Sequence, residues 1–142
     1  MKKIVIALRG RGNLGKSSSI KEAYNLLKQG FLINSITHEI LGADIRAVLT
    51  IGNIKIGIES QGDPSSRLPA SLKLFRELGC KIIICATRTK GATVDAVEAL
   101  KHAAYEVTFL DKVGEQDDSK HITANLTTAN LIVSHVQNAL KT

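Results

Sequence analysis

Hydrophobic and polar positions along the chain predict an alternation of strands and helices. The apolar run at 4–8 is typical of a buried strand, and the apolar positions of 20–27 recur at the three- and four-residue spacing of a helix that ends at Gly30. The same patterns return later, because the near-continuous apolar run 81–86 predicts a central parallel strand and residues 122–140 predict a closing amphipathic helix. This alternation favours an α/β fold, with a three-layer, mostly parallel sheet that has helices on both faces.

Residues 45–59 interrupt that alternation, because apolar residues occupy every second position on both sides of Gly52-Asn53. Two alternating runs around a two-residue Gly-Asn turn predict an antiparallel hairpin, which we expect at one side of the sheet. The remaining patterns predict a strand at 33–40, a helix at 69–79, a helix capped by Thr93 and a strand at 106–110.

A glycine-rich segment joins the first predicted strand to the first predicted helix. Its sequence is Gly10-Arg11-Gly12-Asn13-Leu14-Gly15-Lys16-Ser17, which fits the pattern GxxxxGK[ST]. In that pattern the glycines let successive backbone N–H groups point inward at phosphates. Lys16 would reach the β- and γ-phosphates, the Ser17 hydroxyl would bind Mg²⁺, and the N-terminal end of the helix would add positive potential. The segment therefore predicts a phosphate-binding loop.

On Gly10, Gly15, Lys16 and Ser17, with the strand and helix around them, the chain resembles the P-loop nucleoside triphosphatase superfamily. The resemblance implies an α/β fold that binds a Mg²⁺–nucleoside triphosphate at the carboxyl edge of a mostly parallel sheet. It also implies that Ser18 contacts the α-phosphate, although Ser18 alone is equally well explained as a solvent residue of the first helical turn. Because the [NT]KxD guanine motif of GTPases is incomplete in this chain, ATP is the expected nucleotide.

The second hairpin strand ends in a polar turn that forms the second candidate region. The superfamily places an acidic residue at the end of a strand beside the P-loop, and Glu59 is predicted to hold Mg²⁺ there together with Ser17. The segment Glu59-Ser60-Gln61-Gly62 also resembles the DxxG switch of Ras-like GTPases. Asp63 is an alternative holder of metal or water, and Gln61 is a candidate for orienting an attacking water. A plain polar turn before the next helix is the alternative.

Two cations follow the predicted central strand, in the loop 87–93. Ligands bind outside the carboxyl ends of parallel strands, so Arg88 and Lys90 can contact phosphate there. In a kinase, Arg67 would join them in binding an anionic acceptor. A solvated loop is the alternative interpretation.

The composition limits the classes of partner that we expect. The 142 residues are 44% hydrophobic and 23% charged, which predicts a single globular domain over 1–142. The P-loop resemblance implies that this domain binds a nucleotide. The net charge of +6 suits a polyanionic ligand, but with 4% aromatic residues and no tryptophan, nucleic acid is possible and not favoured. No apolar run approaches the roughly 20 residues that a membrane span needs, and no signal-peptide pattern occurs. We therefore expect a cytoplasmic protein without a membrane partner, and Cys80 and Cys85 as unpaired core residues.

Three functions remain open at this point. The first is a Mg²⁺-dependent ATP phosphohydrolase whose catalytic set is Lys16, Glu59, Gln61, Asp63 and Arg88. The second is a small kinase that transfers phosphate to a small anionic acceptor. The third is a nucleotide-dependent switch or partner-binding module with slow hydrolysis. The closing helix also allows a protein partner or a homodimer seam.

Overall fold

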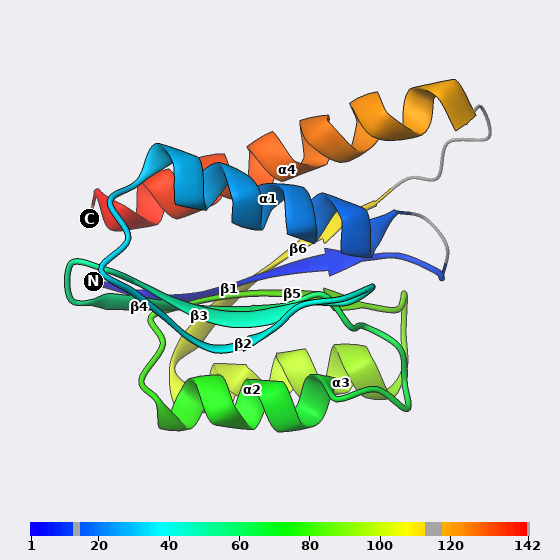
Figure 1. The fold of residues 1–142 in the computed structure, drawn as a ribbon. Helices are drawn as coiled ribbons and strands as arrows, with labels where there is room; N and C mark the ends of the chain where they lie inside the picture. Colours follow the sequence, from blue (N-terminus) through cyan, green and yellow to red (C-terminus); the bar gives the residue numbers. More distant parts are fainter. Residues whose placement is uncertain (13–14, 113–117, 142) are drawn as a thin grey trace.

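The computed structural model describes residues 1–12, 15–112 and 118–141, and the backbone alone for 118–121. Figure 1 shows the order and arrangement of its elements. They are β1 (Lys3–Arg9), α1 (Lys16–Gly30), β2 (Ser35–Ile40), β3 (Arg46–Ile51), β4 (Ile54–Glu59), α2 (Leu68–Glu77), β5 (Ile82–Thr87), α3 (Ala92–Glu98), the 3₁₀ helix η1 (Ala99–Ala103), β6 (Tyr105–Asp111) and α4 (Asp118–Leu140). The predicted α/β fold is confirmed.

The strands form one mixed sheet in the order β2-β3-β4-β5-β1-β6. β4, β5, β1 and β6 are mutually parallel, whereas β2, β3 and β4 pair in antiparallel fashion. The predicted hairpin is confirmed, with Ile51 opposite Ile54 and Gly52 at the positive φ of 62° that a two-residue turn requires. β5 lies between β1 and β4, so the hairpin strand that ends at Glu59 is separated from β1 by one strand.

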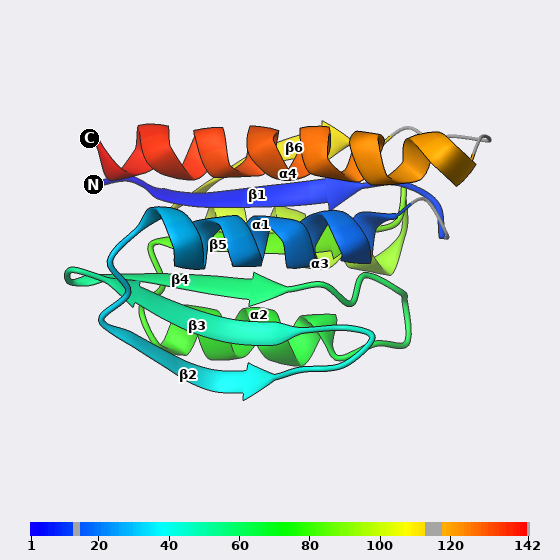
Figure 2. The same cartoon turned by 45° about the horizontal axis from the view of Figure 1, so that its top comes forward.

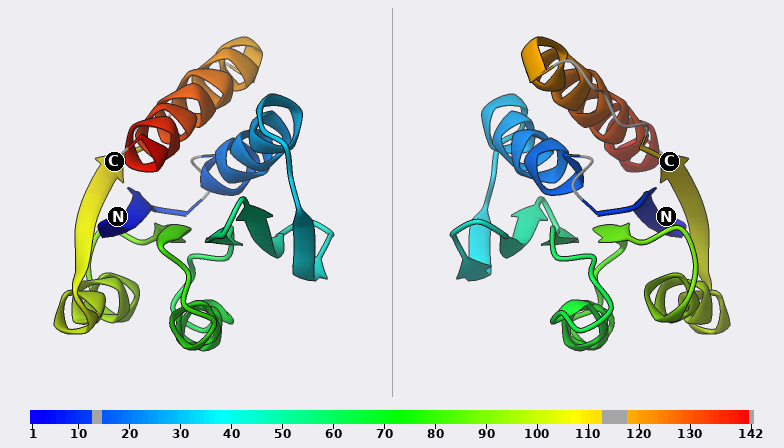
Figure 3. Two further views of the ribbon diagram at one scale, coloured as in Figure 1. Left: turned by 90° about the vertical axis from the view of Figure 1, so that its left-hand side faces the viewer. Right: turned by 90° about the vertical axis from the view of Figure 1, so that its right-hand side faces the viewer.

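Helices cover both faces of the sheet (Figures 1 and 3): α1 and α4 lie on one face, and α2 and α3 lie on the other. The side chains of β5 alternate between the two cores. Ile82 and Ile84 pack under α1 and α4, whereas Ile83 and Cys85 pack under α2 and α3. Every residue of β5 is buried, which explains its near-continuous apolar run and its place in the middle of the sheet. Cys80 and Cys85 are both buried free thiols, and burial raises the pKa of each to about 12.

Two local predictions need correction. Thr93 does not cap α3, because the helix begins at Ala92 behind Gly91 and the Thr93 hydroxyl instead accepts the backbone N–H of Arg88 at 3.0 Å. The predicted inward face of the closing helix is only partly covered. Its second half is buried against the sheet and α1, but Ile122 and Leu126 in its first half are 79% and 42% exposed.

Across the described helices, none has both the length and the apolar character needed to cross a membrane.

Candidate functional site

A cavity of about 250 Å³ opens at the carboxyl ends of the parallel strands. It is lined by Gly12, Gly15, Lys16, Ser17, Ser18, Asp44, Ser60, Gln61, Gly62 and Asp63. These residues come from the glycine-rich loop with the start of α1, from the connection before β3, and from the turn after β4. The fold thus brings the two candidate regions of the sequence to one cavity. Gly10 and Arg11 do not line it, and the predicted contacts Asn13 and Leu14 lie outside the described residues.

Lys16 lies at the first position of α1, directly after Gly15, whose φ of 82° places it in the left-handed region. The side chain is buried, and its ammonium group donates to the backbone carbonyls of Gly10 and, at 2.7 Å, of Thr87 at the end of β5. Burial lowers the pKa of Lys16, the nearby Arg88 lowers it further, and Asp63 acts in the opposite direction. A negative group in addition to Asp63 is therefore favourable beside this ammonium group, because it would offset the cost of burying the charge.

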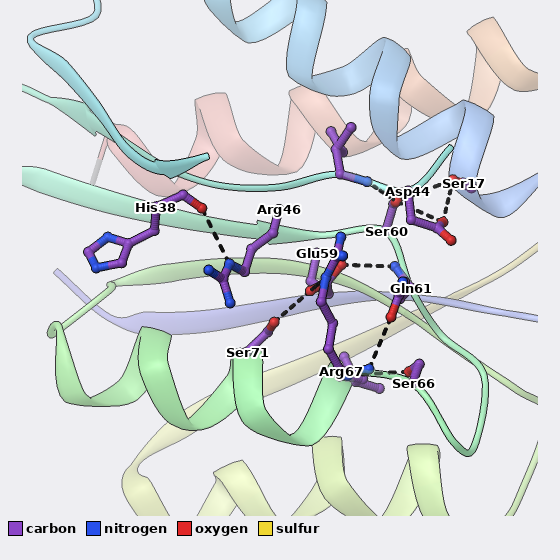
Figure 4. Close-up of polar contacts among 12 residues, drawn as sticks. Ser17, His38, Asp44, Arg46, Glu59, Ser60, Gln61, Ser66, Arg67 and Ser71 are labelled. Carbon is purple, nitrogen blue, oxygen red and sulfur yellow. Dashed lines mark hydrogen bonds and ion pairs between the residues drawn. The ribbon is translucent and has the colours of Figure 1, made fainter. Parts of the chain in front are cut away.

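Three oxygen-bearing side chains meet on one side of the cavity (Figure 4). The Ser17 hydroxyl donates to Asp44 Oδ1 at 2.8 Å, and the Ser60 hydroxyl lies 3.0 Å from the same oxygen. The hairpin register creates this arrangement, because the backbone N–H of Ser60 donates to the Ile45 carbonyl at 2.9 Å and so sets Ser60 beside Asp44. Ser17, Asp44 and Ser60 are called the oxygen cluster below.

Asp44 was not among the residues predicted from the sequence. It belongs to no motif, but the register of the predicted hairpin could have indicated its position. The turn at Gly52-Asn53 fixes a register in which Arg46 pairs with Glu59, and this pairing brings Asp44 to the end of β4.

The oxygen cluster fits Mg²⁺ better than a transition metal. Mg²⁺ prefers oxygen ligands and is commonly held by one or two carboxylates together with substrate phosphates and water. Asp44 supplies one carboxylate and Ser17 the hydroxyl that the P-loop pattern assigns to the metal. No group of three or more His, Cys, Asp or Glu side chains able to hold a metal occurs among the residues described. A metal here would thus depend on phosphate oxygens for its remaining ligands.

Glu59, predicted to hold Mg²⁺, lies in a different environment. Its side chain is fully buried and accepts from Arg67 Nε at 2.7 Å, from the Ser71 hydroxyl at 2.5 Å and from the backbone N–H of Gln61 at 3.1 Å. Figure 4 shows this group beside α2 and apart from the oxygen cluster. The pleat of β4 is the physical reason, because Ile58 packs under α1 and the next side chain must point to the α2 face.

The surroundings of Glu59 therefore do not suit a metal ligand, whereas the Asp44 carboxylate lines the cavity beside Ser17. Arg67, which a kinase would use to hold an acceptor, forms an ion pair with this carboxylate through Nε. Its Nη2 atom is buried and finds no hydrogen-bond partner within the described parts of the chain.

The turn after β4 is fixed at both ends. Gln61 lines the cavity, and its side-chain Oε1 accepts the backbone N–H of Arg67 at 3.0 Å, at the start of α2. At Gly62 an added Cβ would lie 2.7 Å from the carbonyl carbon and oxygen of Ala86. Only glycine allows the turn to approach the end of β5 this closely.

Arg88 and Asp63 meet at the rim of the cavity. The guanidinium Nη2 lies 2.9 Å from Asp63 Oδ1, with side chains 38% and 69% exposed. The same guanidinium passes over the glycine-rich loop, 3.2 Å from the position that a Cβ of Gly12 would occupy. Since exposed ion pairs contribute little to stability, the pair with Asp63 keeps Arg88 near the loop but does not prevent its side chain from changing conformation. Lys90 is exposed and lines none of this cavity.

No protein-family model, curated protein or solved structure matches this chain, so its function is inferred from the geometry of the cavity.

Proposed function

We propose that this chain is a P-loop protein that binds a Mg²⁺–nucleoside triphosphate in the cavity between the glycine-rich loop and the turn after β4. ATP is the nucleotide that we expect there. The observation that carries the proposal is the convergence of Lys16, the start of α1 and the oxygen cluster on one cavity. Each serves a different part of a triphosphate: cation and helix N-terminus for the phosphate charge, oxygens for the metal.

The phosphates would lie against the loop backbone and the first turn of α1. Lys16 lines this cavity, and its ammonium group donates to the backbone carbonyls of Gly10 and Thr87. A phosphate oxygen would add a full negative charge beside a buried cation whose hydrogen-bond acceptors, within the described residues, are two backbone carbonyls. Arg88 adds a second cation at the rim.

Ser17 and Asp44 would hold Mg²⁺, which when bound neutralises phosphate charge and polarises the phosphoryl group. Ser60 supports both residues through its hydroxyl. In this proposal Ser60 orients the ligands without contacting the phosphates itself.

Hydrolysis of the γ-phosphate is the reaction that this cavity favours. The Asp63 carboxylate at the rim can accept a hydrogen bond from a water, Gln61 lines the same wall, and Arg88 can stabilise charge on the phosphoryl oxygens. Transfer to an anionic acceptor is less favoured, because Arg67 is paired with buried Glu59.

The test is binding of fluorescent ATP and GTP analogues with Mg²⁺, followed by phosphate release without an acceptor. Lys16→Ala should weaken binding by about 10- to 100-fold, since a charge-assisted hydrogen bond is lost. The control is Lys73→Ala, because the Lys73 side chain is 78% exposed on α2 and lies outside the cavity. Thermal unfolding of both variants checks that they fold. Absence of binding by the native protein, or equal binding by Lys16→Ala, would contradict the proposal.

A further inference from the structure

A second cavity, of about 300 Å³, lies between the N-terminal halves of α1 and α4. It is lined by Ser18, Glu22, Ile122, Asn125 and Leu126. Figure 2 shows these two helices side by side in front of the sheet. Ser18 lines both this cavity and the one at the glycine-rich loop, so the two cavities adjoin at the first turn of α1.

The walls of the second cavity combine apolar surface with a few polar groups. Ile122 and Leu126, four residues apart on one side of α4, are 79% and 42% exposed. The half-buried Glu22 adds carboxylate oxygens from α1. Apolar walls with a small number of convergent polar groups are typical of small-molecule sites, and the volume is at the lower end of their range.

Asn125 ties this part of α4 to the glycine-rich loop. Its Oδ1 lies 3.2 Å from the Ser19 hydroxyl, which in turn lies 2.9 Å from the Gly15 carbonyl. An added Cβ at Gly15 would overlap with the Asn125 carboxamide. The helix therefore approaches the loop as closely as a glycine permits, and the two cavities are held at a fixed spacing.

We infer that the second cavity binds the nucleoside of the triphosphate. This inference rests on the function proposed above. The phosphate chain lies at the glycine-rich loop and passes Ser18, and the ribose and base then lie between α1 and α4. Ile122 and Leu126 pack against the apolar face of the base. The Glu22 carboxylate accepts hydrogen bonds from ribose hydroxyls or from base N–H groups. Continuity with the phosphate cavity, together with its size, selects this occupant.

Comparing a ligand that carries a nucleoside with one that lacks it distinguishes the phosphate site from the nucleoside site. Calorimetric titration measures the affinity of the native protein for Mg²⁺ with a non-hydrolysable ATP analogue and for Mg²⁺ with inorganic tripolyphosphate. The native protein should bind the ATP analogue at least about tenfold more tightly. Replacing both apolar side chains, Ile122→Ala with Leu126→Ala, should remove most of that preference and leave tripolyphosphate affinity unchanged, which also shows that the variant folds.

The matched control is Leu131→Ala, which truncates another exposed apolar side chain of α4, 47% exposed, that lines neither cavity. It should change neither affinity. Equal affinity of the native protein for the two ligands, or undiminished affinity of the double variant for the ATP analogue, would overturn the inference.

Two further results would also overturn it, for different reasons. A native dimer that the double variant converts to a monomer would mean that a second copy covers Ile122 and Leu126. Failure of the native protein to bind either ligand would remove the phosphate site itself, and the nucleoside site with it.

Discussion

Two carboxylates lie near the end of β4 and differ in almost every physical respect. Glu59 is fully buried on the α2 face, where Arg67, Ser71 and a backbone N–H saturate it. Asp44 is half-buried at the cavity, where its carboxylate accepts from the Ser17 and Ser60 hydroxyl groups. A carboxylate saturated by a cation and two donors has little capacity for a metal, whereas one surrounded by neutral hydroxyls retains it. The face of the sheet, more than the position at a strand end, decides which acid is available for chemistry.

The largest expected effect is on the structural side of this pair. Glu59→Gln keeps the shape but leaves Arg67, whose side chain is only 24% exposed, without its counter-charge. We expect the free energy of unfolding to fall by about 3 kcal/mol, as is usual when one partner of a buried ion pair is removed. Urea denaturation measures the loss. A change below about 1 kcal/mol would mean that the pair is not the stabilising element described here.

The matching change at the cavity should spare stability and affect binding. Asp44→Asn keeps hydrogen-bonding capacity for Ser17 and Ser60 but removes the charge. We expect Mg²⁺-dependent nucleotide affinity to fall about tenfold or more, with the free energy of unfolding within about 1 kcal/mol of the native value. Titration with Mg²⁺ at fixed nucleotide gives the apparent metal affinity. Should Glu59→Gln impair Mg²⁺ dependence more than Asp44→Asn, the assignment of the two acids would be reversed.

An intermediate effect is expected at the rim. Arg88→Ala should slow phosphate release by about tenfold or more while changing thermal stability little, because its ion pair with Asp63 is exposed. Comparing the turnover rate with nucleotide affinity separates catalysis from binding. Lys90→Ala, an exposed cation in the same loop, is the control and should behave like the native protein. Equal rates in the two variants would remove Arg88 from the reaction.

The smallest expected effect concerns pH. The folded-state pKa of Lys16 lies below its ordinary value of 10.5, so the unfolded chain binds more protons than the folded one between these two pKa values. Across that interval the contribution of Lys16 to stability rises with pH. Nucleotide affinity should fall over the same interval, because the ammonium group that attracts phosphate is lost. Fluorescent-nucleotide titrations toward pH 10, with Lys16→Arg as the control that stays charged, measure the difference; identical pH profiles would contradict it.

Short-range patterns in the sequence predicted the elements that depend on neighbouring residues alone. The alternating runs around Gly52-Asn53 predicted the hairpin, and the run at 81–86 predicted a strand covered on both faces. The position of β5 between β1 and β4 could not be predicted, because parallel strands are joined by long connections that carry no local pairing signal.

The candidate site also contains one part that the sequence predicts and one part that it does not. The glycine-rich loop is recognisable because its residues are consecutive, whereas the oxygen cluster assembles from three separate segments. The alternation Ile54, Ile56, Ile58 already places Glu59 on the opposite face, so the direction of its side chain was predictable from the period of the strand. Its pairing with Arg67 was not, since it depends on the path of the turn between them.

Gln61 links the cavity to the opposite side of the molecule. Its carboxamide oxygen satisfies the first turn of α2 while the residue itself forms part of the cavity wall. A ligand that draws this carboxamide inward must leave the Arg67 N–H at the helix start unpaired, at a cost of about 1 kcal/mol. A cavity ligand that forms a hydrogen bond with the Gln61 carboxamide oxygen would therefore compete with the first turn of α2 for the same acceptor.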